Sequence, residues 1–446
     1  MHWMIHRRPV GLLVALTLLG GFAAQRAEAQ VQSMWLDGRQ RVEGPGFRLG
    51  NLELHPGIGV EGGYDSNVFL SDTNPQGSAL LLVRPHIYVS TLGPERREEG
   101  EDRGPPPKVA FRGGASAGYH HFFIDAARSN VEIDTDLRVT VFPERQFSFT
   151  IFDTYSRLIR PFTNQGAIDR NYNRNRNEIG TEFVATTKGG GLRGNVGYAF
   201  GFDLFEGETF QYANNVSHRV DAGSSWRFLP RTSLVYDFRF THNDWINSDQ
   251  GSPVLLSDAN RLRSRIGVNG AVTSHLSVLG MVGHAAGFMA SGLADEYSSV
   301  VGQAEARWHF TPTANVGLGY DRDFFFSVVG NFHRRDRGYL NMSVLLARVF
   351  VIGAEAWVGY LDFGRVVDVT GAPLGADGTT DRKDLVVGAS LSGEYRLASW
   401  LGITTRVGYL GDFSDFEFAR VTTAGLVPDP VDFQKFEVWG GLRASY

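Results

Sequence analysis

Residues 130–141 read N-V-E-I-D-T-D-L-R-V-T-V, a stretch in which apolar and polar side chains alternate. Val131, Ile133, Leu137, Val139 and Val141 fall on one face of an extended chain, while charged residues and Thr fall on the other. Successive side chains of a β-strand point to opposite faces, so a period of two indicates a strand. The run is longer than the five or six residues of an ordinary globular strand. It predicts a long strand with one apolar face.

The same alternation returns along the chain, in residues 192–204, 233–241 and 384–392. Strands of ten or more residues with one apolar face, one polar face and interspersed small residues are typical of a barrel that contacts lipid. A soluble β-sandwich is expected to have shorter strands and a turn signal every 8–12 residues. The pattern therefore predicts an all-β fold, a transmembrane antiparallel β-barrel.

The predicted connections alternate in length, as such barrels require. Tight turns fall at residues 142–145, 187–190, 228–231, 273–275, 310–313 and 397–400. Longer polar stretches fall at residues 160–176, 206–214, 246–258, 362–382 and 414–432. We expect the tight turns to face the periplasm, together with the charged stretch 94–108, and the longer stretches to face the exterior. Aromatic residues beside the tight turns predict a girdle at the membrane interface: Phe142, Trp226, Phe228, Trp308, Phe310 and Trp400.

The alternating runs between His55 and Tyr446 predict about 18 strands, and bacterial barrels of this kind have even counts. Closure would pair the first strand, 56–67, with the last, 433–446. The last strand ends on an aromatic residue, which resembles the C-terminal signal that the barrel-assembly machinery reads. Phe436 and Tyr446 are the candidate residues for that assembly signal. Barrels of 16–18 strands are wide enough to leave an aqueous channel.

The first 29 residues have the plan of a cleaved signal peptide. Arg7 and Arg8 precede an apolar run over residues 10–24, and Ala27-Glu28-Ala29 offers a small-residue cleavage site. The predicted organisation is therefore a signal peptide over 1–29, a periplasmic N-terminal segment over 30–53 and the barrel over 54–446. The predicted location is the outer membrane of a Gram-negative cell, with outer-membrane lipid and the barrel-assembly machinery as partners.

Composition excludes several classes of function. The 446 residues include no Cys, which excludes disulfide scaffolds, thiolate metal sites and thiol nucleophiles. The net charge of −5 gives no electrostatic footprint for nucleic acid. Gly114–Gly118 matches a serine nucleophile elbow and Gly189–Gly194 matches G-x-G-x-x-G, but neither precedes a predicted helix.

Two further candidates for chemistry are weak. Residues 377–384 carry oxygen ligands that could suit Ca²⁺, yet they depart from an EF-hand loop, and a solvated outer loop is the better interpretation. His120 and His121 lie beside Asp125, but adjacent residues of a strand point to opposite faces, so a polar rim is favoured. We therefore expect no enzyme activity and no cofactor.

Charges on the predicted inner face are more informative. Arg261, Arg263 and Arg265 occupy alternate positions and should line the lumen together. With Arg239 and Asp237 they are the candidate selectivity residues, because rings of charge tune the selectivity of pores. The alternative is that these charges form cross-strand ion pairs that stiffen the wall. Asp237 and Asp221 are acids that could neutralise the arginines. Both interpretations stay open at the level of sequence.

The predicted first strand and one hairpin carry a family resemblance. Residues 59–69 read G-V-E-G-G-Y-D-S-N-V-F, and W-H-F-T-P at 308–312 is followed by L-G-Y-D-R at 318–322. These stretches resemble the β-barrel porin-2 family. The resemblance implies an outer-membrane barrel that serves exopolysaccharide export with a periplasmic polysaccharide-export protein, and it implies no catalytic residues. The alternatives are a general diffusion porin for small solutes and a structural or adhesive barrel with a closed lumen.

Overall fold

The computed structural model describes residues 46–91, 108–124, 129–159, 172–248, 251–422 and 425–446. The predicted signal peptide over 1–29 and most of the predicted N-terminal segment lie outside the described residues. Among the residues described, no helix is long and apolar enough to cross a membrane.

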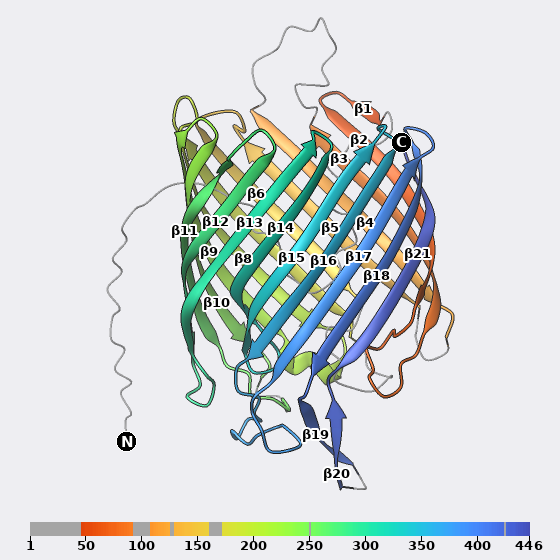
Figure 1. Cartoon of the computed structure of the whole chain (residues 1–446), viewed down its shortest axis with the longest axis vertical. Helices are drawn as coiled ribbons and strands as arrows, with labels where there is room; N and C mark the ends of the chain where they lie inside the picture. The colour runs from red at the N-terminus through yellow and green to blue at the C-terminus, as the bar shows by residue number, and fades with distance from the viewer. Residues whose placement is uncertain (1–45, 92–107, 125–128, 160–171, 249–250, 423–424) are drawn as a thin grey trace, which may run out of the picture.

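Eighteen long antiparallel strands close into one barrel, which confirms the predicted fold class and strand number (Figure 1). The strands are β2 (Leu52–Asp65), β3 (Ser78–Thr91), β4 (Val109–Phe122), β5 (Asn130–Val141), β6 (Phe147–Leu158), β7 (Arg174–Thr186), β8 (Leu192–Phe205), β9 (Asn215–Leu229), β10 (Thr232–Trp245), β11 (Ala259–Ala271), β12 (Leu276–Met289), β13 (Tyr297–Thr311), β14 (Ala314–Phe326), β15 (Phe332–Leu346), β16 (Phe350–Phe363), β17 (Lys383–Arg396), β18 (Leu401–Ser414) and β21 (Phe433–Ser445). A short β1 (Phe47–Leu49) pairs with the start of β2.

The barrel is apolar outside and charged inside. On the outer face Leu318 is 62% exposed and Val282 is 58% exposed. On the inner face Asp384 is 1% exposed. Soluble monomers rarely expose apolar surface on this scale. A continuous apolar outer face with a polar interior is the arrangement that a bilayer requires.

The first and last strands join to close the barrel. Their register runs from Gly57 opposite Ser445 to Asp65 opposite Glu437, and the backbone N–H of Tyr446 donates to the carbonyl of Pro56 at 2.9 Å. The predicted pairing of these two segments is therefore confirmed, and β2 begins at Leu52, slightly before the predicted barrel boundary at 54. Both candidate assembly residues lie on the outer face. Phe436 is exposed, and the ring of Tyr446 lies 4.5 Å from that of Phe47.

Short turns gather at one end of the barrel and long loops at the other, as predicted. The short turns join β5–β6, β7–β8, β9–β10, β11–β12, β13–β14, β15–β16 and β17–β18, and the aromatic residues predicted beside them are exposed. Gly189 and Gly190 in the β7–β8 turn have φ of +86° and +67°, a left-handed backbone that favours glycine. The turn at 347–349 was not predicted.

The long-loop end differs from the prediction in three details. β7 begins at Arg174, so the polar stretch predicted to end at 176 runs into the strand, where Arg174 and Arg176 bind Asp203. A 3₁₀ helix, η3 (Glu208–Ala213), lies in the β8–β9 loop. The β18–β21 connection carries a hairpin of β19 (Glu417–Thr422) and β20 (Gly425–Pro430) that projects beyond the barrel (Figure 1).

The facing of β17 predicts a contrast between two neighbouring residues. Leu391 lies on the outer face opposite Ala354 and Val407, while Ser390 lies on the inner face opposite Glu355 and Gly408. Leu391→Arg should destabilise the barrel in lipid by about 2–4 kcal/mol, the cost of arginine near the bilayer midplane. Ser390→Arg should be tolerated, since it places a guanidinium opposite a carboxylate. Unfolding titrations in lipid vesicles measure the free energy of unfolding of both variants. Equal losses of stability would contradict the assignment of Leu391 to the outer face and Ser390 to the inner face.

The terminal strand predicts an assembly defect. Replacing Phe436 and Tyr446 with Asp should leave unfolded chain in the periplasm, because the apolar face that the assembly machinery is expected to read is lost. The control pair Phe436→Leu and Tyr446→Phe keeps that face apolar and should insert normally. Heat-modifiable barrel in the outer-membrane fraction is the measurement, and normal insertion of the Asp variant would refute the assembly role.

Candidate functional site

The candidate site is the inner wall of the barrel, where the predicted arginines lie on adjacent strands. Asp237 stands directly opposite Arg265 on β11, and Arg239 stands opposite Arg263. Arg265 binds Asp237 at 2.6 Å, and Arg263 binds Asp237 at 3.3 Å and also forms an ion pair with Asp323 of β14. The residues predicted to form the selectivity set are thus brought together, and Arg263 and Arg265 share the carboxylate of Asp237.

The other predicted arginines also have partners. Arg239 binds Asp221 at 2.6 Å, and Asp221 in turn binds Arg219 at 2.7 Å. The Nε of Arg261 donates to the hydroxyl of Tyr297 at 2.9 Å, and its guanidinium lies 4.5 Å from the centre of the Phe326 ring. Cation–π contact and hydrogen bonds hold this side chain against the wall.

Small residues on β12 make room for these long side chains. Arg263 reaches Asp323 across β12 and β13, and the register places it opposite Ala285, which is buried. A Cβ added at Gly287 would lie 2.2 Å from the ring of Tyr297, so this glycine allows the ring to lie on the wall. Asp323 and Tyr297 were not predicted as site residues, because their contacts bridge strands that are not neighbours.

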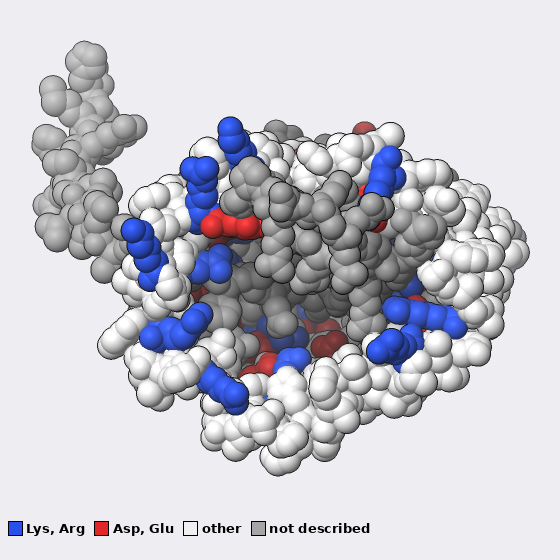
Figure 2. Space-filling model, turned by 90° about the horizontal axis from the view of Figure 1, so that it is seen from above, with Lys and Arg blue, Asp and Glu red and all other residues white. Residues whose placement is uncertain are grey.

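Pairing of opposite charges continues on other strands of the inner wall. Asp321 binds both Arg335 and Arg337 at 2.8 Å. Further pairs join Arg307 to Glu305, and Arg396 and Arg443 to Glu394. Seen from the short-turn end, basic and acidic side chains lie together in the hollow of the barrel (Figure 2). Most of the described arginines of this wall are therefore held rigidly and neutralised.

The sequence motifs have structural explanations. Gly114–Gly118 lies within β4, and Gly189–Gly194 spans a turn between β7 and β8, so neither faces a helix. His120 is buried and binds Glu132 at 2.9 Å, while His121 binds Ser129 at 2.7 Å on the other face. The histidines therefore point apart, as predicted, and Asp125 lies outside the described residues.

The carboxylates of residues 377–384 are used within the protein. Asp384 forms a buried ion pair with Arg382 at 2.7 Å. Asp377 accepts a hydrogen bond from the backbone N–H of Thr379 at 2.9 Å. Within the described ranges, no group of three or more acidic or histidine side chains is arranged to hold a metal ion.

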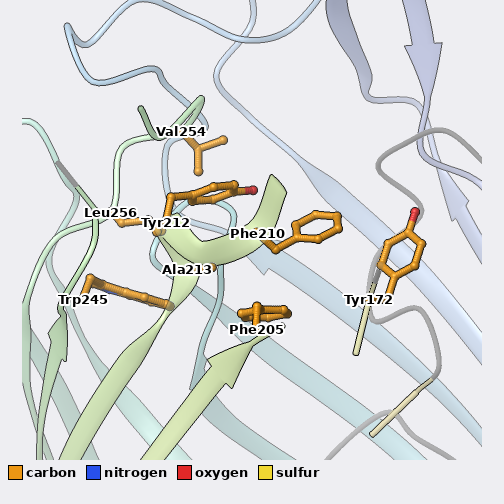
Figure 3. Packing of buried hydrophobic residues seen from close by; sticks show 8 residues of the cluster. All are labelled: Tyr172, Phe205, Phe210, Tyr212, Ala213, Trp245, Val254 and Leu256. Carbon is orange, nitrogen blue, oxygen red and sulfur yellow. The ribbon is translucent and has the colours of Figure 1, made fainter. Parts of the chain in front are cut away.

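Loops from opposite sides of the barrel meet over the long-loop mouth, and we call this layer the loop cap. Its largest apolar cluster combines residues of the β6–β7, β8–β9 and β10–β11 connections with the ends of β8 and β10 (Figure 3): Tyr172, Phe205, Phe210, Tyr212, Ala213, Trp245, Val254 and Leu256. Val328 of the β14–β15 loop and Leu374 of the β16–β17 loop pack against it. β8 and β16 stand nearly opposite, since eight of the 18 steps around the ring separate them. The cap therefore bridges the mouth.

Hydrogen bonds between loops fix the loop cap. The backbone N–H of Leu255 donates to the carbonyl of Val367 at 2.8 Å. Asn331, which is 1% exposed, donates to the carbonyl of Leu255 at 3.0 Å and accepts from the N–H of Ser257 at 2.6 Å. Buried amides with both functions satisfied specify one arrangement. These bonds tie the β10–β11, β14–β15 and β16–β17 connections together.

One carboxylate ties the start of the β8–β9 loop to the neighbouring strands. Glu206 accepts hydrogen bonds from Arg157 at 2.6 and 2.8 Å and from Asn173 at 3.2 Å. The hydrogen bonds from Arg157, foremost, hold the pKa of Glu206 below its ordinary value. Because the pKa is lowered in the folded state, this contact stabilises the fold fully at pH values above the ordinary pKa of a Glu carboxyl. The contribution is lost as the pH falls through the lowered value.

Comparisons with known proteins find no sequence relative and only low similarity to solved structures. No protein-family model and no curated protein sequence matches the chain. Among solved structures, the copper transporter OprC is 10% identical over 90% of this chain and 81% of that one, with a TM-score of 0.44. The outer membrane protein opdK from Pseudomonas aeruginosa is 10% identical over 88% and 99%, with a TM-score of 0.45. The siderophore receptor PirA from Acinetobacter baumannii is 8% identical over 90% and 81%, with a TM-score of 0.46.

Proposed function

We propose that this chain is an outer-membrane channel that provides the passage for an exported exopolysaccharide. The observation that carries the proposal is a closed barrel with an apolar outer face and an inner wall of paired charges. Such a wall offers hydrogen-bonding groups without a strong net field. Passage through a pore requires contacts that are weak and repeated, and paired charges would make contacts of that kind with a hydroxyl-rich polymer.

The polysaccharide itself is proposed from the resemblance of residues 59–69 and 308–322 to the β-barrel porin-2 family. The tight turns would face the periplasm, where a periplasmic polysaccharide-export protein would deliver the polymer. A general diffusion porin for small solutes remains the alternative within the channel class. Bilayer recordings with and without polymer separate the two, since a diffusion porin should conduct ions without being blocked by polysaccharide.

The loop cap favours a second candidate, a structural barrel with a closed lumen. Apolar packing between opposite loops covers at least part of the mouth. For the channel proposal the cap must open or leave a path beside it. An experiment that locks the cap distinguishes the two functions.

Cysteines at Leu255 and Val367, whose backbone atoms are hydrogen-bonded, provide that lock. The chain has no native Cys, so a disulfide formed within one molecule can only join the two introduced residues. If polymer passes through the cap, the oxidised double variant should conduct less in planar bilayers and export less polysaccharide than the same variant after reduction. Each single Cys variant is the matched control and should not respond to oxidation. A wild-type barrel that neither conducts nor supports export would establish the closed scaffold instead.

The arginine set predicts a shift in ion selectivity. Replacing Arg261, Arg263 and Arg265 with Gln leaves Asp237 and Asp323 without their cations, so the lumen becomes more negative. The reversal potential in a KCl gradient should shift toward cation selectivity. Asp237→Asn is the control and should shift it the opposite way. Unchanged selectivity in folded variants would mean that the arginines are wall structure remote from the ion path.

A further inference from the structure

A second group of arginines lies at the short-turn mouth and differs from the paired set. Arg112 of β4 and Arg138 of β5 stand directly opposite each other in the register. The next pair toward the β5–β6 turn, Phe111 and Val139, points outward. Because successive residues of a strand alternate between faces, Arg112 and Arg138 point to the inner face. Among the described residues, no carboxylate forms an ion pair with either guanidinium, and that of Arg138 lies over the ring of Phe152, 5.6 Å from its centre.

Arg193 of β8 and Arg227 of β9 repeat this arrangement. Arg193 stands opposite Ser225, so Arg227 is its diagonal neighbour on the inner face. Both side chains are exposed, and within the described part of the chain neither has an ion-pair partner. Glu182, the nearby acid of β7, accepts a hydrogen bond from Asn195 at 2.7 Å instead. We call Arg112, Arg138, Arg193 and Arg227 the inner-mouth arginines.

Acidic partners for arginine are distributed unevenly around the short-turn end of the barrel. On the β13–β21 side, Arg307, Arg396 and Arg443 are each held by a glutamate. On the β4–β9 side, the part of the chain that the structure describes gives the inner-mouth arginines no glutamate or aspartate partner. Asp136 is one inner-face position deeper on β5 than Arg138, and it forms no ion pair with Arg112 or Arg138. Lys and Arg side chains lie around the short-turn end of the barrel (Figure 2).

Like charges placed directly opposite on a sheet destabilise it, so the wall gains nothing from Arg112 and Arg138 as a pair. An oxoanion between them would relieve the repulsion and accept charge-assisted hydrogen bonds from both guanidinium forks. We propose that the inner-mouth arginines form a binding site for a polymer that carries carboxylate or phosphate groups. This deepens the proposed function and rests on it: the cargo is anionic, and it is captured at the mouth that precedes the neutralised wall.

The test is direct binding to the folded, detergent-solubilised full-length barrel. The probes are fluorescently labelled oligogalacturonate, short inorganic polyphosphate and neutral dextran of matched length. The variant replaces all four inner-mouth arginines with Gln. The matched control removes the same charge at the same end, through Gln at four exposed turn residues outside the inner wall: Arg145, Lys188, Arg231 and Arg348.

Wild type should bind one or both anionic probes and not dextran, with an affinity that falls as salt rises. The inner-mouth variant should lose affinity by at least about tenfold, since several charge-assisted hydrogen bonds disappear. The turn variant should stay within about twofold, because its charges lie on exposed turns beyond the strands of the inner wall and are screened by salt. Lys at all four positions keeps the charge and should retain most of the binding, which guards against a folding defect.

Equal binding of dextran, no binding of either anionic probe, or full affinity of the inner-mouth variant would each overturn the site. These outcomes are independent of conductance. A barrel that conducts but does not bind the anionic probes keeps the channel and loses the anion site. A barrel that binds them but never conducts keeps the site and loses the channel.

Discussion

Closure of the backbone ladder between β2 and β21 is the constraint on which the rest of the structure depends. In hydrocarbon every N–H and C=O must find a partner within the protein, because water cannot supply one. The first and last strands each carry one edge that only the other can satisfy, and they meet over Gly57–Asp65 and Glu437–Ser445. Once the ring is closed, alternate residues must face lipid, so apolar side chains point outward and charge is confined to the lumen.

The charges confined to the lumen then determine the rigidity and the charge balance of its wall. Arginine and aspartate on neighbouring strands neutralise each other, and glycine and alanine on β12 allow the pairs to reach across strands that lie between them. The result is a wall that is rigid and polar with little net field over β9–β15. The inner-mouth arginines stand apart from this arrangement, since the described chain supplies them with no acid.

Much of the fold could be predicted from sequence, because facing and strand length are local properties of an alternating pattern. Residues 130–141 and 384–392 reveal their facing without reference to any neighbour, and the tight turns between strands set the register. The second partner of Arg263, Asp323, could not be predicted in the same way. This contact crosses two intervening strands and depends on the curvature and stagger of the closed ring. The loop cap was missed for a related reason. Val254, Val328 and Leu374 have no periodicity and meet only because the ring brings distant loops together.

The hairpin of β19 and β20 has a consequence for how copies of the chain share a crowded surface. β19 is flanked by β20 on one side and by residues 374–376 on the other, so β20 forms the outer edge of this small sheet among the residues described. An exposed edge strand is a template for association with another chain. Two of the six residues of β20 are Pro428 and Pro430, which have no N–H to donate to an added strand. The two prolines therefore hinder β20 from pairing with a strand of another molecule. Dense packing of the barrels need not lead to aggregation through this hairpin.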